Sequence, residues 1–206
     1  MKAKIIVFMG IDGSGKSSTC ISVRDALRAR GYRVVTIHHT PPIFELLHRS
    51  LRGTTTDEPD DRPSLIDGDI TPRRQFIRIL IGVLAYIDAL VGRSRILNAM
   101  GEADILICDR YPYDHLAYYI SDAPRLLTRL FTAICPHPAL TFLVDVPPEV
   151  AYARRPEGSF DSCTRNTQRF RSIANRDLVR NLVVLDNTRP HVDVVSDAIT
   201  MTLKVV

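Results

Sequence analysis

Cysteine is scarce in this 206-residue chain, and its placement excludes two kinds of site. The four cysteines lie far apart and form no C-x-x-C pair. The sequence therefore shows neither a disulfide framework nor the ligand spacing of a structural zinc site. Widely spaced free thiols are typical of proteins in a reducing cytosol. The cysteines are Cys20, Cys108, Cys135 and Cys163.

The chain also shows no long basic run, and we expect neither a leader nor a membrane span. Its 27 basic residues are mixed with 23 acidic ones, so the scattered arginines suit a small anionic substrate better than nucleic acid. The first residues run directly into an apolar strand pattern without a cleavage site. The most apolar stretch, residues 79–92, is too short to cross a bilayer and contains Asp88. We therefore expect a cytoplasmic protein that binds neither nucleic acid nor membrane.

Five short apolar runs alternate with stretches of helical periodicity, and this alternation predicts the fold class. Each run is typical of a strand buried on both faces. The pattern predicts an α/β fold with a five-stranded parallel sheet, helices on both faces and right-handed crossovers. The length predicts a single domain over residues 1–206. The expected strands cover residues 4–9, 33–37, 104–108, 140–146 and 182–185.

Helical spacing and punctuating residues place the expected helices and loops. Thr71 and Pro72 are typical of the start of a long helix. Residues 54–70 are rich in aspartate and are expected to form a polar loop, and residues 155–164 a second loop. The expected helices cover residues 16–30, 43–51, 72–100, 112–120, 124–135, 147–154, 166–180 and 192–203.

The segment GIDGSGKS, residues 10–17, matches G-x-x-x-x-G-K-[ST] at every fixed position. It lies between an expected buried strand and an expected helix, which is the context that a phosphate-binding P-loop requires. Its glycines let successive N–H groups turn inward around a phosphate, and the helix adds its positive end. The lysine of such a loop reaches the β- and γ-phosphates, and the following hydroxyl binds Mg²⁺. We therefore expect ATP and Mg²⁺ as cofactors, bound by Gly10, Gly13, Ser14, Gly15, Lys16, Ser17 and Ser18.

An acidic residue follows the third expected strand and indicates the second half of a metal site. Asp109 comes directly after the apolar run 105–108. Ligands of parallel sheets bind beyond the carboxyl ends of the strands, so Asp109 is expected beside the phosphate loop, with Ser17 on the Mg²⁺ ion. Arg110 could neutralise phosphate charge from the same turn. The alternative is a helix-capping aspartate beside a surface arginine.

These segments resemble the thymidylate kinase family of nucleoside-monophosphate kinases. The resemblance includes residues 10–18, then Asp109-Arg110-Tyr111 with Ala117-Tyr118 after it, and the segment LVDVPPEV at residues 143–150 leading to Arg154. It implies the P-loop NTPase fold with a short lid after the fourth strand. It also implies that Asp12 faces the sugar of the acceptor, that Arg110 binds the transferred or acceptor phosphate, and that the protein forms a homodimer through its helices.

We expect the lid, residues 154–165, to supply a catalytic arginine. Phosphoryl transfer spreads negative charge over oxygens, and an arginine aimed at them accelerates transfer by about 10³–10⁵-fold. The phosphate loop offers glycine at position 13, so this arginine must come from elsewhere. We expect Arg154 first and Arg165 second, with solvated helix charges as the alternative. The residues expected to act in catalysis are Asp12, Lys16, Asp109, Arg110, Arg154 and Arg165.

Two segments depart from the family pattern where the acceptor should bind. Where the family carries an arginine after the second strand, this chain has His38-His39-Thr40-Pro41-Pro42. The places of a thymine-stacking aromatic and a base-reading arginine fall near Leu84 and Asp88. The two histidines could hydrogen-bond an acceptor or be ordinary loop residues. We therefore predict that thymidylate is a weak acceptor and that Asp88 contributes to acceptor binding.

Three functions fit these observations. The first is transfer of the γ-phosphoryl group of MgATP to a small-molecule acceptor, foremost a nucleoside monophosphate. The second is a kinase of the same fold acting on a non-nucleotide or modified metabolite. The third is a regulatory nucleotide-binding NTPase, which would need neither lid arginines nor an acceptor site.

Overall fold

A computed structural model describes residues 3–39, 72–118, 125–175, 178–179 and 181–206 of the chain. The helix expected at residues 43–51 and the loop expected at residues 54–70 lie outside these residues. Among the described helices, none combines the length and the apolarity that crossing a bilayer requires.

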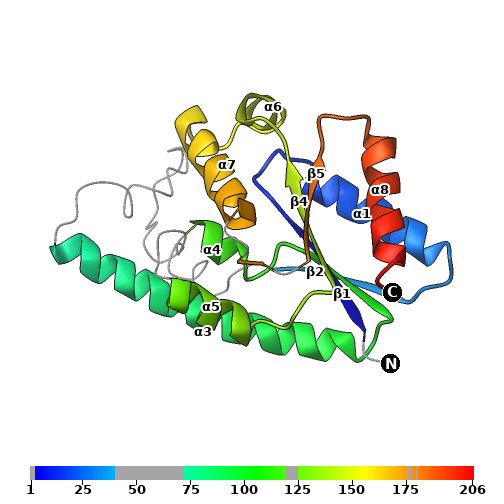
Figure 1. Cartoon of the computed structure of the whole chain (residues 1–206), viewed down its shortest axis with the longest axis horizontal. Helices are drawn as coiled ribbons and strands as arrows, with labels where there is room; N and C mark the ends of the chain where they lie inside the picture. The colour runs from blue at the N-terminus through cyan, green and yellow to red at the C-terminus, as the bar shows by residue number, and fades with distance from the viewer. Residues whose placement is uncertain (1–2, 40–71, 119–124, 176–177, 180) are drawn as a thin grey trace, which may run out of the picture.

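Five strands form one parallel sheet, as the apolar runs predicted. The strands are β1 (Lys4–Met9), β2 (Val34–His38), β3 (Ile105–Asp109), β4 (Leu140–Asp145) and β5 (Leu182–Asp186). Their order in the sheet is β2-β3-β1-β4-β5, and every neighbouring pair is parallel. The central strand β1 therefore lies between β3 and β4, which places the phosphate loop at the middle of the sheet edge (Figure 1).

Seven described helices surround the sheet. They are α1 (Lys16–Arg28), α3 (Pro72–Met100), α4 (Asp114–Tyr118), α5 (Arg125–Ile134), α6 (Pro148–Arg154), α7 (Phe160–Asn175) and α8 (His191–Leu203). Most agree with the predicted ranges within a few residues. The long helix begins at Pro72 as expected.

The start of α7 corrects one prediction. Residues 155–164 were expected to form a loop, but α7 begins at Phe160 and ends at Asn175 instead of spanning 166–180. Ser159 accounts for the early start, because its Oγ accepts a hydrogen bond from the backbone N–H of Ser162 at 3.2 Å. This is the bond that a capping serine makes to the first turn of a helix. Only residues 155–159 of the expected lid region remain non-helical.

The alternating side chains of β1 supply two separate cores, one on each face of the sheet. Ile5, Val7 and Met9 pack with α3, α4, α5 and α7, whereas Ile6 and Phe8 pack with α1 and α8. Figure 1 shows α1 and α8 side by side on one face, and α3 and α5 along the other. Because helices cover both faces of the sheet, the strands are continuous apolar runs in the sequence.

The polar residues of the site follow the carboxyl ends of these strands. Gly10 follows β1, Asp109 ends β3, and His39 follows β2. Asn187 follows β5. Its N–H donates to the carbonyl oxygen of Asp145 at 3.0 Å and so continues the pairing of β5 with β4. One edge of the sheet therefore gathers residues that are as far apart as positions 10 and 187.

Candidate active site

The phosphate loop owes its shape to glycines in backbone conformations that other residues avoid. Gly13 has φ of +80° and Gly15 has φ of +87°. A Cβ on Gly13 would overlap the backbone carbonyl oxygen of Ala151 in α6. A Cβ on Gly15 would overlap the side-chain amide of Asn187. Glycine is therefore required at both positions by conformation and by space.

Asn187 fastens this loop to the last strand. Its Nδ2 donates a hydrogen bond of 2.6 Å to the carbonyl oxygen of Ser14, and its side chain is buried. Sequence reasoning missed this residue. The available signal was a polar side chain directly after the fifth apolar run, at the edge where ligands of parallel sheets bind.

Lys16 begins α1 and turns its ammonium group back over the loop. Its Nζ donates to the carbonyl oxygen of Ile11 at 3.2 Å and to Asp12 Oδ1 at 3.0 Å. The residue is only 5% exposed, so the charge is held in a sheltered place. The positive end of α1 points in the same direction. The arrangement suits an anion with several oxygens, such as the β- and γ-phosphates of a nucleotide.

Arg110 meets the same carboxylate from the opposite side. Its Nη2 donates to Asp12 Oδ1, the oxygen that Lys16 also contacts. Burial pushes the pKa of Asp12 upward, but Lys16 and Arg110 outweigh this effect and hold the pKa below its usual value. The backbone of Arg110 has φ of +70°, which is uncommon for a residue with a side chain. Such conformations cluster at functional sites.

A second carboxylate lies on the other side of Arg110 and was not predicted. Asp114, in the first turn of α4, has Oδ2 at 3.8 Å from Arg110 Nη1. Burial raises the pKa of Asp114 to about 7, and the positive charges of Arg110 and Lys16 oppose the rise. The residue stands five positions after Asp109, and no pattern in the sequence marks it as part of the site.

Ser17 and Asp109 come together as the motifs predicted. Ser17 Oγ donates a hydrogen bond of 2.7 Å to Asp109 Oδ2. Asp109 is 8% exposed, and its Oδ1 has no hydrogen-bond partner within the described part of the chain. His38 Nδ1 lies 3.4 Å from Asp109 Oδ2.

This pair fits a magnesium ion that is bound together with a nucleotide. A buried carboxylate oxygen without a partner is a hard ligand of the kind Mg²⁺ prefers, and Mg²⁺ in such sites takes one or two protein ligands with phosphates and waters. Where residues are described, no group of three or more His, Cys, Asp or Glu side chains is placed to hold a metal by itself. The ion would therefore depend on phosphate oxygens for most of its coordination.

Of the two predicted lid arginines, Arg154 is placed at the phosphate loop. Its Nη2 donates to the carbonyl oxygen of Asn187 at 3.3 Å, and its Nη1 would lie 3.8 Å from a Cβ on Gly15. Arg165 is an exposed residue of α7. Arg155 was not chosen from the sequence, yet its positive charge acts on Asp12 and helps to lower the pKa of that carboxyl. Arg155 also pairs with Glu157 at 2.5 Å.

A pocket lies between the phosphate loop and the start of α7. It brings Asp12 and Arg155 together with Tyr118, a residue of the Ala-Tyr pair after the DRY segment. The phosphate loop, Tyr118 of α4 and the expected lid therefore line one space. The full lining is Ile11, Asp12, Tyr118, Arg155, Glu157, Ser162, Cys163 and Asn166.

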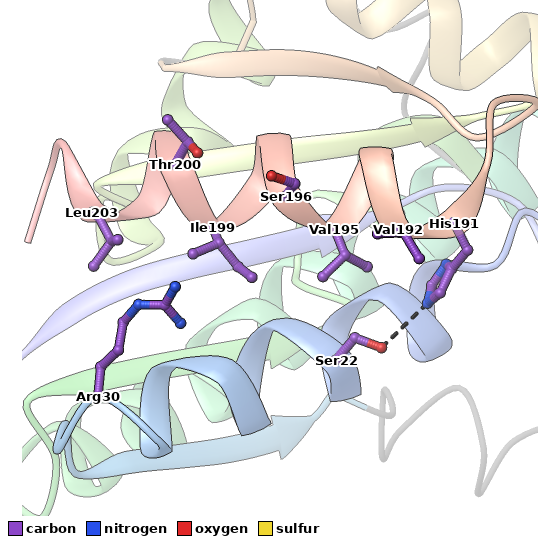
Figure 2. A pocket seen from close by; sticks show the side chains of 9 residues that line it. All are labelled: Ser22, Arg30, His191, Val192, Val195, Ser196, Ile199, Thr200 and Leu203. Atoms are coloured by element: carbon purple, nitrogen blue, oxygen red, sulfur yellow. Dashed lines mark hydrogen bonds between the residues drawn. The ribbon is translucent and has the colours of Figure 1, made fainter.

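A second hollow, between α1 and α8, has a different chemistry. It has a volume of about 380 Å³, and Figure 2 shows valine, isoleucine and leucine side chains along α8 facing α1. Ser22 Oγ and His191 Nε2 lie 3.2 Å apart at one end. The lining contains no carboxylate and a single arginine, so it lacks the groups that phosphoryl transfer requires. It consists of Ser22, Arg30, His191, Val192, Val195, Ser196, Ile199, Thr200 and Leu203.

His38, the last residue of β2, and His39, which follows it, face different surroundings. His38 is half exposed beside Asp109, whereas His39 is buried against α3. A Cβ on Gly92 would lie 2.5 Å from His39 Cε1. Burial lowers the pKa of His39 to about 4. His115 lies edge-to-face with His39 at 6.3 Å, and burial lowers its pKa to about 3.

The two positions on α3 that were expected to read the base differ in burial. Asp88 is fully buried within the structure, and Leu84 is partly exposed. Tyr86 turns away to α5, where its hydroxyl donates to the carbonyl oxygen of Leu127 at 2.6 Å and its ring packs on Phe131. The role of Asp88 in acceptor binding stays a prediction.

The buried histidines predict how stability depends on pH. His39 and His115 are neutral in the folded chain down to about pH 4 and 3, but titrate near 6.5 when unfolded. Between pH 6.5 and 4 the unfolded chain therefore binds two more protons at these sites, so stability falls as the pH falls. Asp114, with its raised pKa of about 7, binds one proton more when folded and acts in the opposite direction. The net difference is about one proton, so stability still falls as the pH falls in this range.

Urea unfolding at several pH values between 4.5 and 6.5 measures this slope. His115→Gln should bring it close to zero, because one of the two histidine protons is removed from the balance. The exposed His137, changed to Gln, serves as the control and should keep the wild-type slope. An equal slope in wild type and His115→Gln would contradict the account.

Comparison with known proteins agrees with this geometry. The thymidylate kinase family model matches residues 8–199. A thymidylate kinase of Dinoroseobacter shibae is 30% identical, with 95% of this chain and 94% of the relative covered. One from Thermomicrobium roseum is also 30% identical, over 96% and 93%. A thymidylate kinase of Leptospira borgpetersenii is 26% identical, over 98% and 95%. Because the likeness extends over nearly the whole length of each chain, this chain belongs to the thymidylate kinase family and is a P-loop phosphotransferase.

Proposed function

We propose that this enzyme transfers the γ-phosphoryl group of ATP to a nucleoside monophosphate. The observation that carries the proposal is the meeting of Lys16 and Arg110 on one oxygen, Asp12 Oδ1. Lys16 belongs to the phosphate loop, where the donor nucleotide binds, and Arg110 belongs to the DRY segment on the acceptor side. A phosphoryl group passing between two phosphates needs a cation from each side, and this is the point at which they converge.

The roles of the remaining residues follow from their positions. The backbone N–H groups of the loop and Lys16 would bind the donor phosphates. Ser17 and Asp109 would hold Mg²⁺, which supplies neutralisation of the charge on the β- and γ-phosphates. The acceptor phosphate is already anionic, so the chain needs no general base and contributes chiefly position and charge.

A screen of acceptors tests the proposed function. ADP release from MgATP is measured with each nucleoside monophosphate, with nucleosides and with other phosphorylatable metabolites. At least one monophosphate should reach a kcat/KM of about 10⁴ M⁻¹s⁻¹ or more. If a metabolite without a phosphate is preferred, the second function holds. ADP release that no acceptor stimulates would instead favour the regulatory NTPase.

The identity of the monophosphate is a finer question. The relatives named above are thymidylate kinases, but this chain carries His38 and His39 in place of the expected arginine segment. It also places a buried aspartate, Asp88, at an expected base-reading position. We therefore propose that thymidylate is a weak acceptor. In the screen, a kcat/KM for thymidylate above that of every other monophosphate would contradict this.

Asp109→Asn should raise the Mg²⁺ concentration for half-maximal activity by about tenfold or more, because a buried carboxylate beside the ion becomes neutral. The matched control is Asp145→Asn at the end of β4, whose carboxylate pairs with Arg171 at 2.9 Å. Titrating activity with Mg²⁺ at saturating ATP gives the comparison. Superimposable curves for Asp109→Asn and wild type would remove Asp109 from the metal site.

Arg154→Ala should lower kcat by about 10²-fold and raise the KM for ATP much less, because an arginine on the transferred group contributes most in the transition state. Its place beside Gly15 supports this role more directly than the position of Arg165. Steady-state kinetics of Arg154→Ala and Arg165→Ala are compared with Arg171→Ala as the control. Normal kcat in both of the first two variants would show that the catalytic charge comes from elsewhere.

A homodimer also remains a proposal. Exposed apolar side chains recur along α3 at intervals of three, four and seven residues, and a second copy could cover them. They are Leu80, Val83, Ile87, Leu90 and Leu97.

A further inference from the structure

We propose that Asp114 is a positioning residue, which holds Arg110 toward the acceptor when phosphate displaces Asp12. The proposal rests on the proposed function, because it concerns the cation that faces the acceptor phosphate. It assigns a role to a side chain that none of the motifs includes. Three features support this role. Asp114 is buried, it lies close to Arg110, and bound phosphate would displace Asp12 from Arg110.

Asp114 is a buried acid with few contacts of its own. It is 8% exposed, and neither of its carboxylate oxygens has a hydrogen-bond partner in the described part of the chain. Its nearest charged group is Arg110, with Nη1 at 3.8 Å from Oδ2. Burying a carboxylate is costly unless a charge compensates it. The guanidinium of Arg110 provides that compensation.

Asp12 and Asp114 contact different nitrogens of one guanidinium. Asp12 Oδ1 accepts a hydrogen bond from Nη2 of Arg110, and Asp114 lies beside Nη1. The oxygen of Asp12 is also shared with Lys16. Phosphate oxygens that bind Lys16 and Arg110 must therefore take over the place that Asp12 Oδ1 holds here. After this exchange Asp114 is the carboxylate that remains on Arg110.

A restrained guanidinium matters because arginine is long and flexible. Fixing it costs side-chain entropy, and a loose arginine stabilises a transition state poorly. Two features already restrict the Arg110 side chain. Its backbone is left-handed, and it makes a hydrogen bond with the Tyr118 side chain. Above pH 7, where Asp114 is ionised, it adds a negative charge at the far end of the side chain.

The alternative is that Asp114 only stabilises the start of α4. An acid in the first turn of a helix interacts favourably with the helix dipole, but this effect belongs to exposed termini and is small. Such a role would change the stability of the chain without separating kcat from KM. Asp193 in the first turn of α8 is exposed and offers a matched control for it.

The first experiment is steady-state kinetics of Asp114→Asn at about pH 8.5, where the wild-type carboxyl is ionised, with the monophosphate that wild type uses best. The amide has the same shape but no charge. Because one negative charge is removed near an anionic acceptor, the acceptor KM should not rise, whereas kcat should fall about tenfold or more as Arg110 loses its orientation. The dissociation constant for ATP should stay within twofold. Asp193→Asn should match wild type throughout.

A double variant shows whether Asp114 acts through Arg110. In an Arg110→Ala background, adding Asp114→Asn should change kcat by less than twofold, because the group to be held is already absent. A tenfold additional loss would overturn the proposal, as would an unchanged kcat in Asp114→Asn alone. Failure of Asp114→Asn to fold would also overturn it, since the amide loses no hydrogen bond and removes a buried charge.

A stability measurement decides the case without any acceptor, and so separates this proposal from the proposed function. Arg110→Ala leaves Asp114 buried without its compensating charge, and the urea midpoint should fall. Adding Asp114→Asn should restore part of that loss. Additive losses would contradict the coupling. A wild type that phosphorylates no monophosphate would overturn the proposed function, while this cycle would still test the pair.

Discussion

Lys16→Met should leave a folded chain whose turnover falls by at least about 10³-fold, because the charge that faces the donor phosphates is lost where it contributes most. Methionine preserves the apolar stem of a side chain that is 5% exposed, so packing is largely kept. ATP binding should weaken as well, since the lysine contacts phosphate before and during transfer.

The measurement is kcat, with the dissociation constant for ATP from calorimetry. Lys4→Met is the control, because Lys4 is exposed at the opposite end of the central strand. A second consequence concerns Asp12, which would keep Arg110 but lose Lys16. Its pKa should rise, because Lys16, one of the three cations that lower it, is gone. Turnover of Lys16→Met within tenfold of wild type would remove the lysine from the transfer step.

Gly13→Ala should have the largest effect on the structure of the loop. The residue has φ of +80°, and a Cβ there would overlap the carbonyl oxygen of Ala151. A backbone atom cannot move aside as a flexible side chain can, so either the loop or the start of α6 must shift. We expect a loss of about 3 kcal/mol or more in the free energy of unfolding and a large loss of ATP affinity.

Gly31→Ala separates strain from overlap. Gly31 has φ of +89°, almost the same conformation, but nothing lies within 4 Å of its Cβ position. It should therefore lose only about 1 kcal/mol, the cost of the left-handed conformation with a side chain. Urea unfolding of both variants gives the comparison. Equal losses would mean that conformation alone, and not the contact with α6, demands glycine at position 13.

The sheet could be predicted because its strands carry their own signal. Both faces are covered, so Ile5 to Met9 and Ile105 to Cys108 had to be apolar without interruption. The phosphate loop was equally accessible, since Gly13 and Gly15 are required by conformations local to the loop. Ser17 and Asp109 could be paired because the carboxyl ends of parallel strands share one edge.

Other parts depended on side-chain contacts that no sequence pattern marks. The early start of α7 was missed because Ser159 acts through one hydrogen bond, and serine is as common in loops as at helix starts. Asp114 was missed because no motif marks its burial beside Arg110, four residues earlier. The burial of His39 follows from the close approach of Gly92, which lies 53 positions later in the sequence.

The bond from Asn187 to Ser14 joins residues 173 positions apart, and this has a consequence for synthesis of the protein. The ribosome releases the phosphate loop first, and the amide that fastens the loop follows 173 residues later. A growing chain can pair β1 with β3 and β4 before that point. It reaches a complete nucleotide cradle only after β5 has emerged, so nascent chains that stall before residue 187 should not hold ATP as the finished enzyme does.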